Sequence, residues 1–173
     1  MEKFCKSYFE VFSAIELCLE QKLLMPSLSL IYTTIDSLAW VAYGDLAVGK
    51  RYQKWINNYM YRDGALEASA IDLYAARCAI LHTLTPDSAL SEQNKARVVT
   101  YAWGDSDVEH LKIAIDRFSE TECVAIHVDA LLDSLRRGVV LFMEDLPNDL
   151  EAMNRSNKHF GACLLYTSDA ADE

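Results

Sequence analysis

An arginine and a histidine lie five residues apart in a segment that is otherwise almost entirely apolar. Between residues 70 and 84, Arg77 and His82 stand among alanine, leucine, isoleucine and cysteine, and Asp72 is the only other charged side chain. Arginine carries a rigid fork of N–H donors that matches phosphate oxygens, and it stays charged. Histidine exchanges protons near neutral pH. The two residue types together are suited to holding a phosphate and moving a proton beside it.

The apolar character of residues 70–84 predicts a helix that is buried on most sides. A guanidinium in such a helix requires a carboxylate partner, a phosphate ligand or both. Asp36 is the best candidate partner, because it is the only charge between residues 27 and 44 of another apolar helix. Two interpretations stay open. Asp36 either holds Arg77 or orients His82 in a site, or it forms a buried pair with Arg77 that only fixes the register of the helices.

The neighbours of the pair provide weaker candidates. Tyr74 lies one turn before Arg77 and could contact a substrate, although an aromatic residue on a core helix usually has a packing role. Thr83 either lines the site or caps the end of the helix, and Asp72 is predicted to be a solvated residue of the first turn. The predicted site has two catalytic residues and three supporting ones: Arg77, His82, Asp36, Tyr74 and Thr83.

Apolar residues recur at spacings of three and four along much of the chain, which predicts amphipathic helices. The predicted helices cover residues 4–18, 28–42, 52–59, 70–84 and 129–142. Asp129 is the predicted N-cap of the last of them. Residues 97–103 and 122–128 alternate in polarity like β-strands. We therefore expect a mainly α protein, an antiparallel helical bundle with a small β-strand insertion between the fourth and the last long helix.

The run Arg77-Cys78-Ala79-Ile80-Leu81-His82 on the fourth helix resembles the Arg-x4-6-His signature of the HEPN superfamily. Members are helical domains that commonly act as metal-independent ribonucleases in defence and toxin–antitoxin systems. The resemblance covers roughly residues 3–82 and extends to residues 129–146. It implies a HEPN-like bundle, a homodimer whose site lies in a cleft between two signature helices, and products with a 2′,3′-cyclic phosphate and a 5′-hydroxyl.

Two residues depart from the pattern of that family. Cys78 follows the arginine, where active members often carry a polar residue. Some members continue as His-x-Tyr, with the tyrosine as a target of nucleotide transfer, whereas this chain has His82-Thr83-Leu84. Regulation by nucleotide transfer is therefore impossible at Leu84. Regulation by a different antitoxin protein is not excluded.

RNA cleavage without a metal needs a base for the 2′-hydroxyl proton, an acid for the departing 5′-oxygen and a cation beside the phosphorus. His82 can serve either proton-transfer role, Arg77 supplies the cation, and no cofactor is expected. Residues five apart on an ideal helix point about 140° from one another, so one chain should present the pair imperfectly to a phosphate. We expect a metal-independent endoribonuclease, assisted by a second copy of the chain. The alternative is a non-catalytic HEPN-like domain that binds a nucleotide, RNA or a partner protein.

The overall charge constrains the possible RNA partner. The chain of 173 residues has a formal net charge of −10. Its last eleven residues, 163–173, resemble the translation of a sequencing-library adapter and are predicted to be a non-native tail after a single domain of residues 1–162. Without the three acidic residues of that tail the charge is −7. An acidic body repels polyanions at long range, which favours one structured RNA held by many contacts over bulk RNA.

The remaining composition predicts an ordinary cytoplasmic chain. No secretory leader or apolar stretch long enough for a membrane span is expected. The cysteines lack CxxC spacing, so a zinc site is not expected. Tyr52, Trp55 and Tyr59 alternate with basic residues such as Arg51 and Lys54, which fits an RNA-stacking surface but is explained more simply by core packing.

Overall fold

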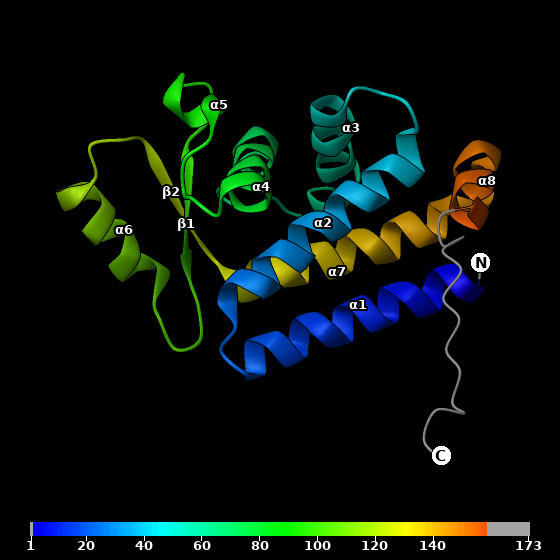
Figure 1. The fold of residues 1–173 in the computed structure, drawn as a ribbon, viewed down its shortest axis with the longest axis horizontal. Coiled ribbons are helices and arrows are strands. Elements are labelled where there is room, and N and C mark those ends of the chain that lie inside the picture. The colour runs from blue at the N-terminus through cyan, green and yellow to red at the C-terminus, as the bar shows by residue number, and fades with distance from the viewer. Residues whose placement is uncertain (1, 159–173) are drawn as a thin grey trace, which may run out of the picture.

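The computed structural model describes residues 2–158, so the predicted non-native tail, residues 163–173, lies outside the described part of the chain. The fold is mainly helical with a small two-stranded sheet, which confirms the predicted fold class (Figure 1). The helices are α1 (Glu2–Glu20), α2 (Leu24–Tyr43), α3 (Val48–Trp55), α4 (Ala70–Thr83), α5 (Ala89–Glu92), α6 (Val108–Phe118), α7 (Val128–Asp145) and α8 (Leu150–Lys158). A π-helical turn, η1 (Ile56–Met60), continues α3, and a 3-10 turn, η2 (Leu146–Asn148), follows α7.

The two predicted strands form one parallel pair. Strand β1 (Val98–Ala102) lies beside β2 (Cys123–His127), with Val98 opposite Cys123. A parallel pair needs a crossover connection, and helix α6 provides it. The sequence prediction contained no helix at this position, and α6 has no fully buried residue. The sheet, α5 and α6 lie at one end of the molecule, with α8 at the opposite end (Figure 1).

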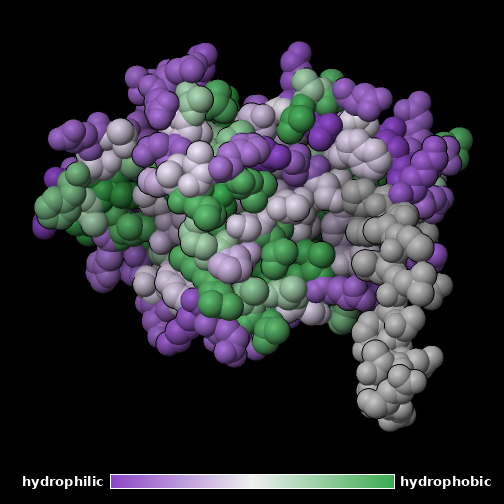
Figure 2. All heavy atoms as spheres, in the orientation of Figure 1, coloured by the Kyte–Doolittle hydropathy of each residue, from purple (hydrophilic) through white to green (hydrophobic). Residues whose placement is uncertain are grey.

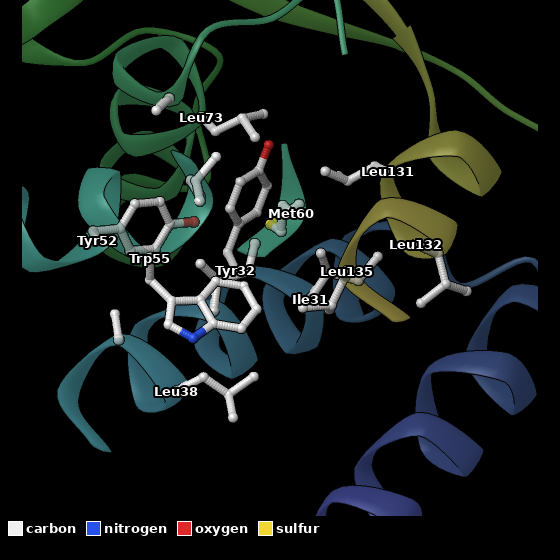
Figure 3. Packing of buried hydrophobic residues seen from close by; sticks show 14 of the residues in the cluster. Ile31, Tyr32, Leu38, Tyr52, Trp55, Met60, Leu73, Leu131, Leu132 and Leu135 are labelled. Atoms are coloured by element: carbon white, nitrogen blue, oxygen red, sulfur yellow. The ribbon is translucent and has the colours of Figure 1, made fainter. Parts of the chain in front are cut away.

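Helix α2 occupies the centre of the bundle and contacts α1, α3, α4, α7 and α8. Figure 3 shows side chains of α2, α3, η1, α4 and α7 meeting in one core around Tyr32 and Trp55. The hydroxyl of Tyr32 lies 2.5 Å from the hydroxyl of Tyr101, which ties the helical core to β1. Full burial of one leucine, isoleucine or phenylalanine side chain of this core contributes about 1.5–3 kcal/mol to folding. The core therefore fixes α4 firmly against α2, α3 and β1.

Two local predictions are wrong. Asp72 is not solvated but only 2% exposed, because its carboxylate forms a capping box with Ser69 and receives the guanidinium of Arg97. Helix α7 begins after His127, whose Nδ1 accepts a hydrogen bond from the backbone N–H of Asp129 at 3.2 Å. His127, and not Asp129, is therefore the N-cap.

Hydrophobic residues gather on the visible face of the molecule over α1 and the first turns of α2, with hydrophilic residues around them (Figure 2). Phe9 and Leu17 of α1 are 74% and 58% exposed. Within residues 2–158, no helix combines the length and the apolar character that a membrane crossing requires.

Candidate active site

Arg77 and His82 are in direct contact within one chain. Nη1 of Arg77 lies 3.1 Å from Nε2 of His82, near the exposed end of α4. A guanidinium has donors only, so Nε2 accepts the hydrogen bond and carries no proton in this contact. The two side chains meet although their positions lie about 140° apart around an ideal helix, because the long arginine side chain spans that angle. One chain thus places a fixed cation beside a proton-accepting nitrogen.

The predicted partner of Arg77 is in place. Nη2 of Arg77 donates a hydrogen bond to Oδ2 of Asp36 on α2 at 2.6 Å, and the two side chains are only 14% and 18% exposed. Burial by itself lowers the pKa of Arg77, but the hydrogen bond and charge of Asp36 outweigh burial and raise that pKa. Arg77 is therefore a permanent cation whose fork is held by α2 on one side and by His82 on the other.

A second arginine completes an ion network that the sequence did not reveal. Nη2 of Arg51, on α3, lies 3.9 Å from Oδ1 of Asp36, and its side chain is 17% exposed. Nη1 of Arg51 donates two long hydrogen bonds, to the carbonyls of Gly44 and Leu46, at 3.3 and 3.5 Å. One carboxylate is thus shared between two guanidinium groups, and the three side chains carry a net charge of about +1.

Several atoms of this network form no hydrogen bond, although Oδ1 of Asp36 keeps its ion pair with Arg51. Nε of Arg51, Nε of Arg77, Oδ1 of Asp36 and the hydroxyl of Tyr52 are buried and form no hydrogen bond in the described structure. Burial, followed by the nearby charge of Asp36, raises the pKa of Tyr52 well above its ordinary value, so this phenol remains a donor. Buried polar groups are rarely left unpaired in folded proteins. The network therefore contains three buried donors without hydrogen bonds beside a net positive charge.

A cleft of about 540 Å³ lies beside the end of α4. His82, Cys78 and Thr83 line it from α4, and Asp87 and Glu92 line it from the segment around α5. Arg77 is not among the lining residues, so the cleft and the ion network meet at His82 and Cys78. A ligand in this cleft would touch the histidine directly and would reach the arginine only past it.

The remaining predicted residues have different positions. Thr83 lines the cleft, and its hydroxyl donates a hydrogen bond to the carbonyl of Ala79, one turn earlier in α4, at 2.8 Å. Tyr74 packs against Tyr52, with ring centroids 5.5 Å apart, and against Gly49, where an added Cβ would lie 2.9 Å from its ring. Tyr74 therefore holds α4 against α3 and does not line the cleft.

Tyr52 and Trp55 are fully buried, which agrees with core packing and excludes both rings from stacking on RNA.

Within residues 2–158, the structure contains no group of three or more His, Cys, Asp or Glu side chains that could hold a metal ion. Comparison of the chain with protein-family models, curated proteins and solved structures found no match.

Proposed function

We propose that this protein is a metal-independent endoribonuclease that cleaves RNA by attack of the 2′-hydroxyl, with Arg77 and His82 as its catalytic residues. The observation that carries this proposal is the contact between Nη1 of Arg77 and Nε2 of His82 at the exposed end of α4. Asp36 supports the site by holding the other arm of Arg77 at 2.6 Å.

The first step is binding of the scissile phosphate. A phosphate oxygen competes with His82 for Nη1 of Arg77, because a charge-assisted hydrogen bond to an anion is stronger than one to a neutral imidazole. Arg51 adds a second positive charge across Asp36. Phosphate binding would therefore release Nε2 of His82 from its contact with Arg77.

The second step is transfer of a proton. The released Nε2 accepts the proton of the 2′-hydroxyl, the oxygen forms a bond to phosphorus, and the bond from phosphorus to the 5′-oxygen breaks. The departing 5′-oxygen takes a proton from an acid, which His82 of a second copy supplies in a homodimer. The products are a 2′,3′-cyclic phosphate and a 5′-hydroxyl, and DNA is not cut because it lacks the attacking group.

The charge of the chain informs the proposed setting. A net charge of −10 opposes binding of bulk RNA, so the substrate is a structured RNA recognised through many local contacts. Restricted cleavage of this kind suits a toxin–antitoxin or phage-defence role, in which an antitoxin protein restrains the enzyme.

A second candidate is a non-catalytic helical domain that binds a nucleotide, RNA or a partner protein. The ion network favours it, because Arg51, Asp36 and Arg77 join α3, α2 and α4, and a network of this kind can act only to fix helix register. The position of Arg77 outside the cleft favours it as well.

Cleavage of total RNA in EDTA distinguishes the two candidates. We expect His82→Ala to lower the cleavage rate by about 10²–10⁴-fold, the range for loss of a proton-transfer group. Arg77→Ala should lower it by about 10²–10³-fold, the range for loss of a donor to the charge that develops in the transition state. Arg117→Ala and His110→Ala are matched controls, because both residues are exposed on α6. Circular dichroism checks that each variant is folded. Cutting that survives in both folded site variants, or RNA that stays intact with the wild type, would favour the non-catalytic domain.

A further inference from the structure

We infer that the cleft at the end of α4 is a nucleobase site that selects guanine beside the cleaved phosphate. This inference deepens the proposed function, on which it rests for the position of the base relative to the cut. The cleft is distinct from the ion network, because Arg51, Asp36 and Arg77 do not line it.

The walls of the cleft suit a flat aromatic ring. Cys78 and Ala79 form its side on α4, and Ala89 faces it from α5. These side chains are small, and Cys78 and Ala89 present surface to the cleft, whereas Ala79 is only 2% exposed. The volume of about 540 Å³ lies within the range of ordinary small-molecule sites. A nucleobase can therefore enter with its faces against apolar atoms and its edge toward polar ones.

The hydroxyl groups of the cleft already have partners. The hydroxyls of Thr83 and Thr85 lie 2.6 Å apart, and that of Thr85 donates to the carbonyl of Asp87 at 3.0 Å. Ser88 caps α5 by accepting a hydrogen bond from the backbone of Ser91. These groups form the frame of the cleft and leave little hydrogen-bonding capacity for a ligand.

The carboxylates of Asp87 and Glu92 are the groups that remain for a ligand. Both residues are exposed and line the cleft, and neither carboxylate forms an ion pair or hydrogen bond with another residue of the described chain. A carboxylate is an acceptor only. The edge of the cleft therefore repels phosphate and attracts a ligand that presents N–H donors.

Guanine is the base that meets this requirement. Its N1–H and 2-amino group are adjacent donors that one carboxylate can bind with both oxygens. Adenine and cytosine each present one amino group beside an acceptor, and uracil presents one N–H between two acceptors. His82 both lines the cleft and contacts Arg77, so a guanine in the cleft would bring its ribose to the proposed base and cation.

Titration of the full chain with guanosine and inosine, followed by ligand-observed NMR, tests the site without reference to cleavage. Inosine lacks only the 2-amino group, so we expect it to bind about tenfold or more weakly than guanosine, as for loss of one charge-assisted hydrogen bond. The double variant Asp87→Asn/Glu92→Gln should lose this preference. The matched double variant Asp116→Asn/Glu144→Gln changes two exposed carboxylates elsewhere and should keep it. Equal binding of guanosine and inosine by the wild type would overturn the inference, as would a preference that survives in Asp87→Asn/Glu92→Gln.

Mapping of the cut positions separates this inference from the proposed function. We expect the wild type to cut beside guanosine and Asp87→Asn/Glu92→Gln to cut with that preference reduced about tenfold. Guanosine-selective binding without any cleavage would support the base site and overturn the ribonuclease. Cleavage with no preference for guanosine would support the ribonuclease and overturn the base site.

Discussion

Two arginine–carboxylate networks lie along the same helix, and they differ in how completely their hydrogen bonds are satisfied. At the start of α4, Asp72 accepts from the backbone and hydroxyl of Ser69 at 2.9 and 2.7 Å, and from the backbone N–H of Arg97 at 2.7 Å. The guanidinium of Arg97 adds two further hydrogen bonds to Asp72, at 3.1 and 2.8 Å. Beside the second half of α4, Asp36 of α2 accepts one short hydrogen bond from Arg77, and the other carboxylate oxygen of Asp36 accepts none.

The difference indicates separate roles for the two networks. The pair of Asp72 and Arg97 is electrically neutral, both carboxylate oxygens of Asp72 accept hydrogen bonds, and the Asp72 side chain is only 3% exposed, so the pair acts as a structural link between α4 and β1. The network of Asp36, Arg51 and Arg77 carries excess positive charge, spare donors and a contact that leads to an exposed histidine. A closed network stabilises the fold, whereas an incomplete one can take a ligand.

Removal of the closed network should have the largest effect on stability. We expect Asp72→Asn to lower the free energy of unfolding by about 3–5 kcal/mol, the usual result of breaking a buried ion pair and leaving its cation unpaired. Urea unfolding followed by circular dichroism measures this change. Asp116→Asn, on the exposed side of α6, serves as the control and should stay within about 0.5 kcal/mol of the wild type. A loss below about 1 kcal/mol for Asp72→Asn would contradict the structural assignment.

The open network should respond differently to loss of its carboxylate. We expect Asp36→Asn to lower the free energy of unfolding by about 1.5–3 kcal/mol, as for one hydrogen bond to a charged group. Inorganic phosphate should restore part of that loss, because Arg51 and Arg77 can bind an anion where the carboxylate charge was.

The readout is urea unfolding with and without phosphate at roughly 50 mM. The ionic strength is matched with added salt, so that charges are screened equally in both samples. The matched control is Asp72→Asn, in which Arg97 is the single guanidinium and phosphate should have little effect. Equal recovery of both variants would show that phosphate acts through general salt effects and not through a site at Arg51 and Arg77.

The sequence predicted most of the elements and the ion pair of Asp36 with Arg77. Periodic apolar spacing located the long helices, and alternation located both strands. The pairing of Asp36 with Arg77 was predictable because each is an isolated charge in an apolar helix, and such charges tend to find each other. For Asp36 and Arg77, the sequence alone indicated a partner because each charge stood in an apolar helix.

Other features depended on tertiary packing. Arg51 belongs to an ordinary basic helix face, and its approach to Asp36 arises only when α3 packs on α2. Asp72 was misjudged because its partner Arg97 lies 25 residues away, although the spacing of Ser69 and Asp72 is a capping-box signal that was available. Helix α6 was missed because the sequence of neither strand indicates that the two strands pair in parallel, and only a parallel pair requires a crossover helix.

Acid should act on the closed network through Asp72. Burial raises the pKa of this carboxyl, but the hydrogen bonds from Ser69 and Arg97 outweigh burial and lower the pKa below its ordinary value. A depressed pKa contributes stability that is present above the unfolded pKa of about 3.9 and is lost as the pH falls through the folded value.

The free energy of unfolding of the wild type should therefore fall toward that of Asp72→Asn as the pH drops below about 4. Urea unfolding at a series of pH values measures the gap between the two proteins. A gap that stays constant down to the lowest pH at which both are folded would show that protonation of Asp72 does not weaken the network.

The smallest expected change in stability belongs to His82, and it bears most directly on the comparison. His82 is exposed, and its described hydrogen bond is the one to Arg77, so His82→Ala leaves Nη1 open to water and should alter the free energy of unfolding by less than about 0.5 kcal/mol. His127→Ala is the matched control, because it removes the N-cap of α7 and should cost about 1 kcal/mol. If His82→Ala cost as much as His127→Ala, the histidine would be a structural clamp on Arg77, and the open network would have to be regarded as closed. If His82→Ala is neutral in stability but removes RNA cleavage, the exposed end of α4 has a chemical role that the folded state does not need.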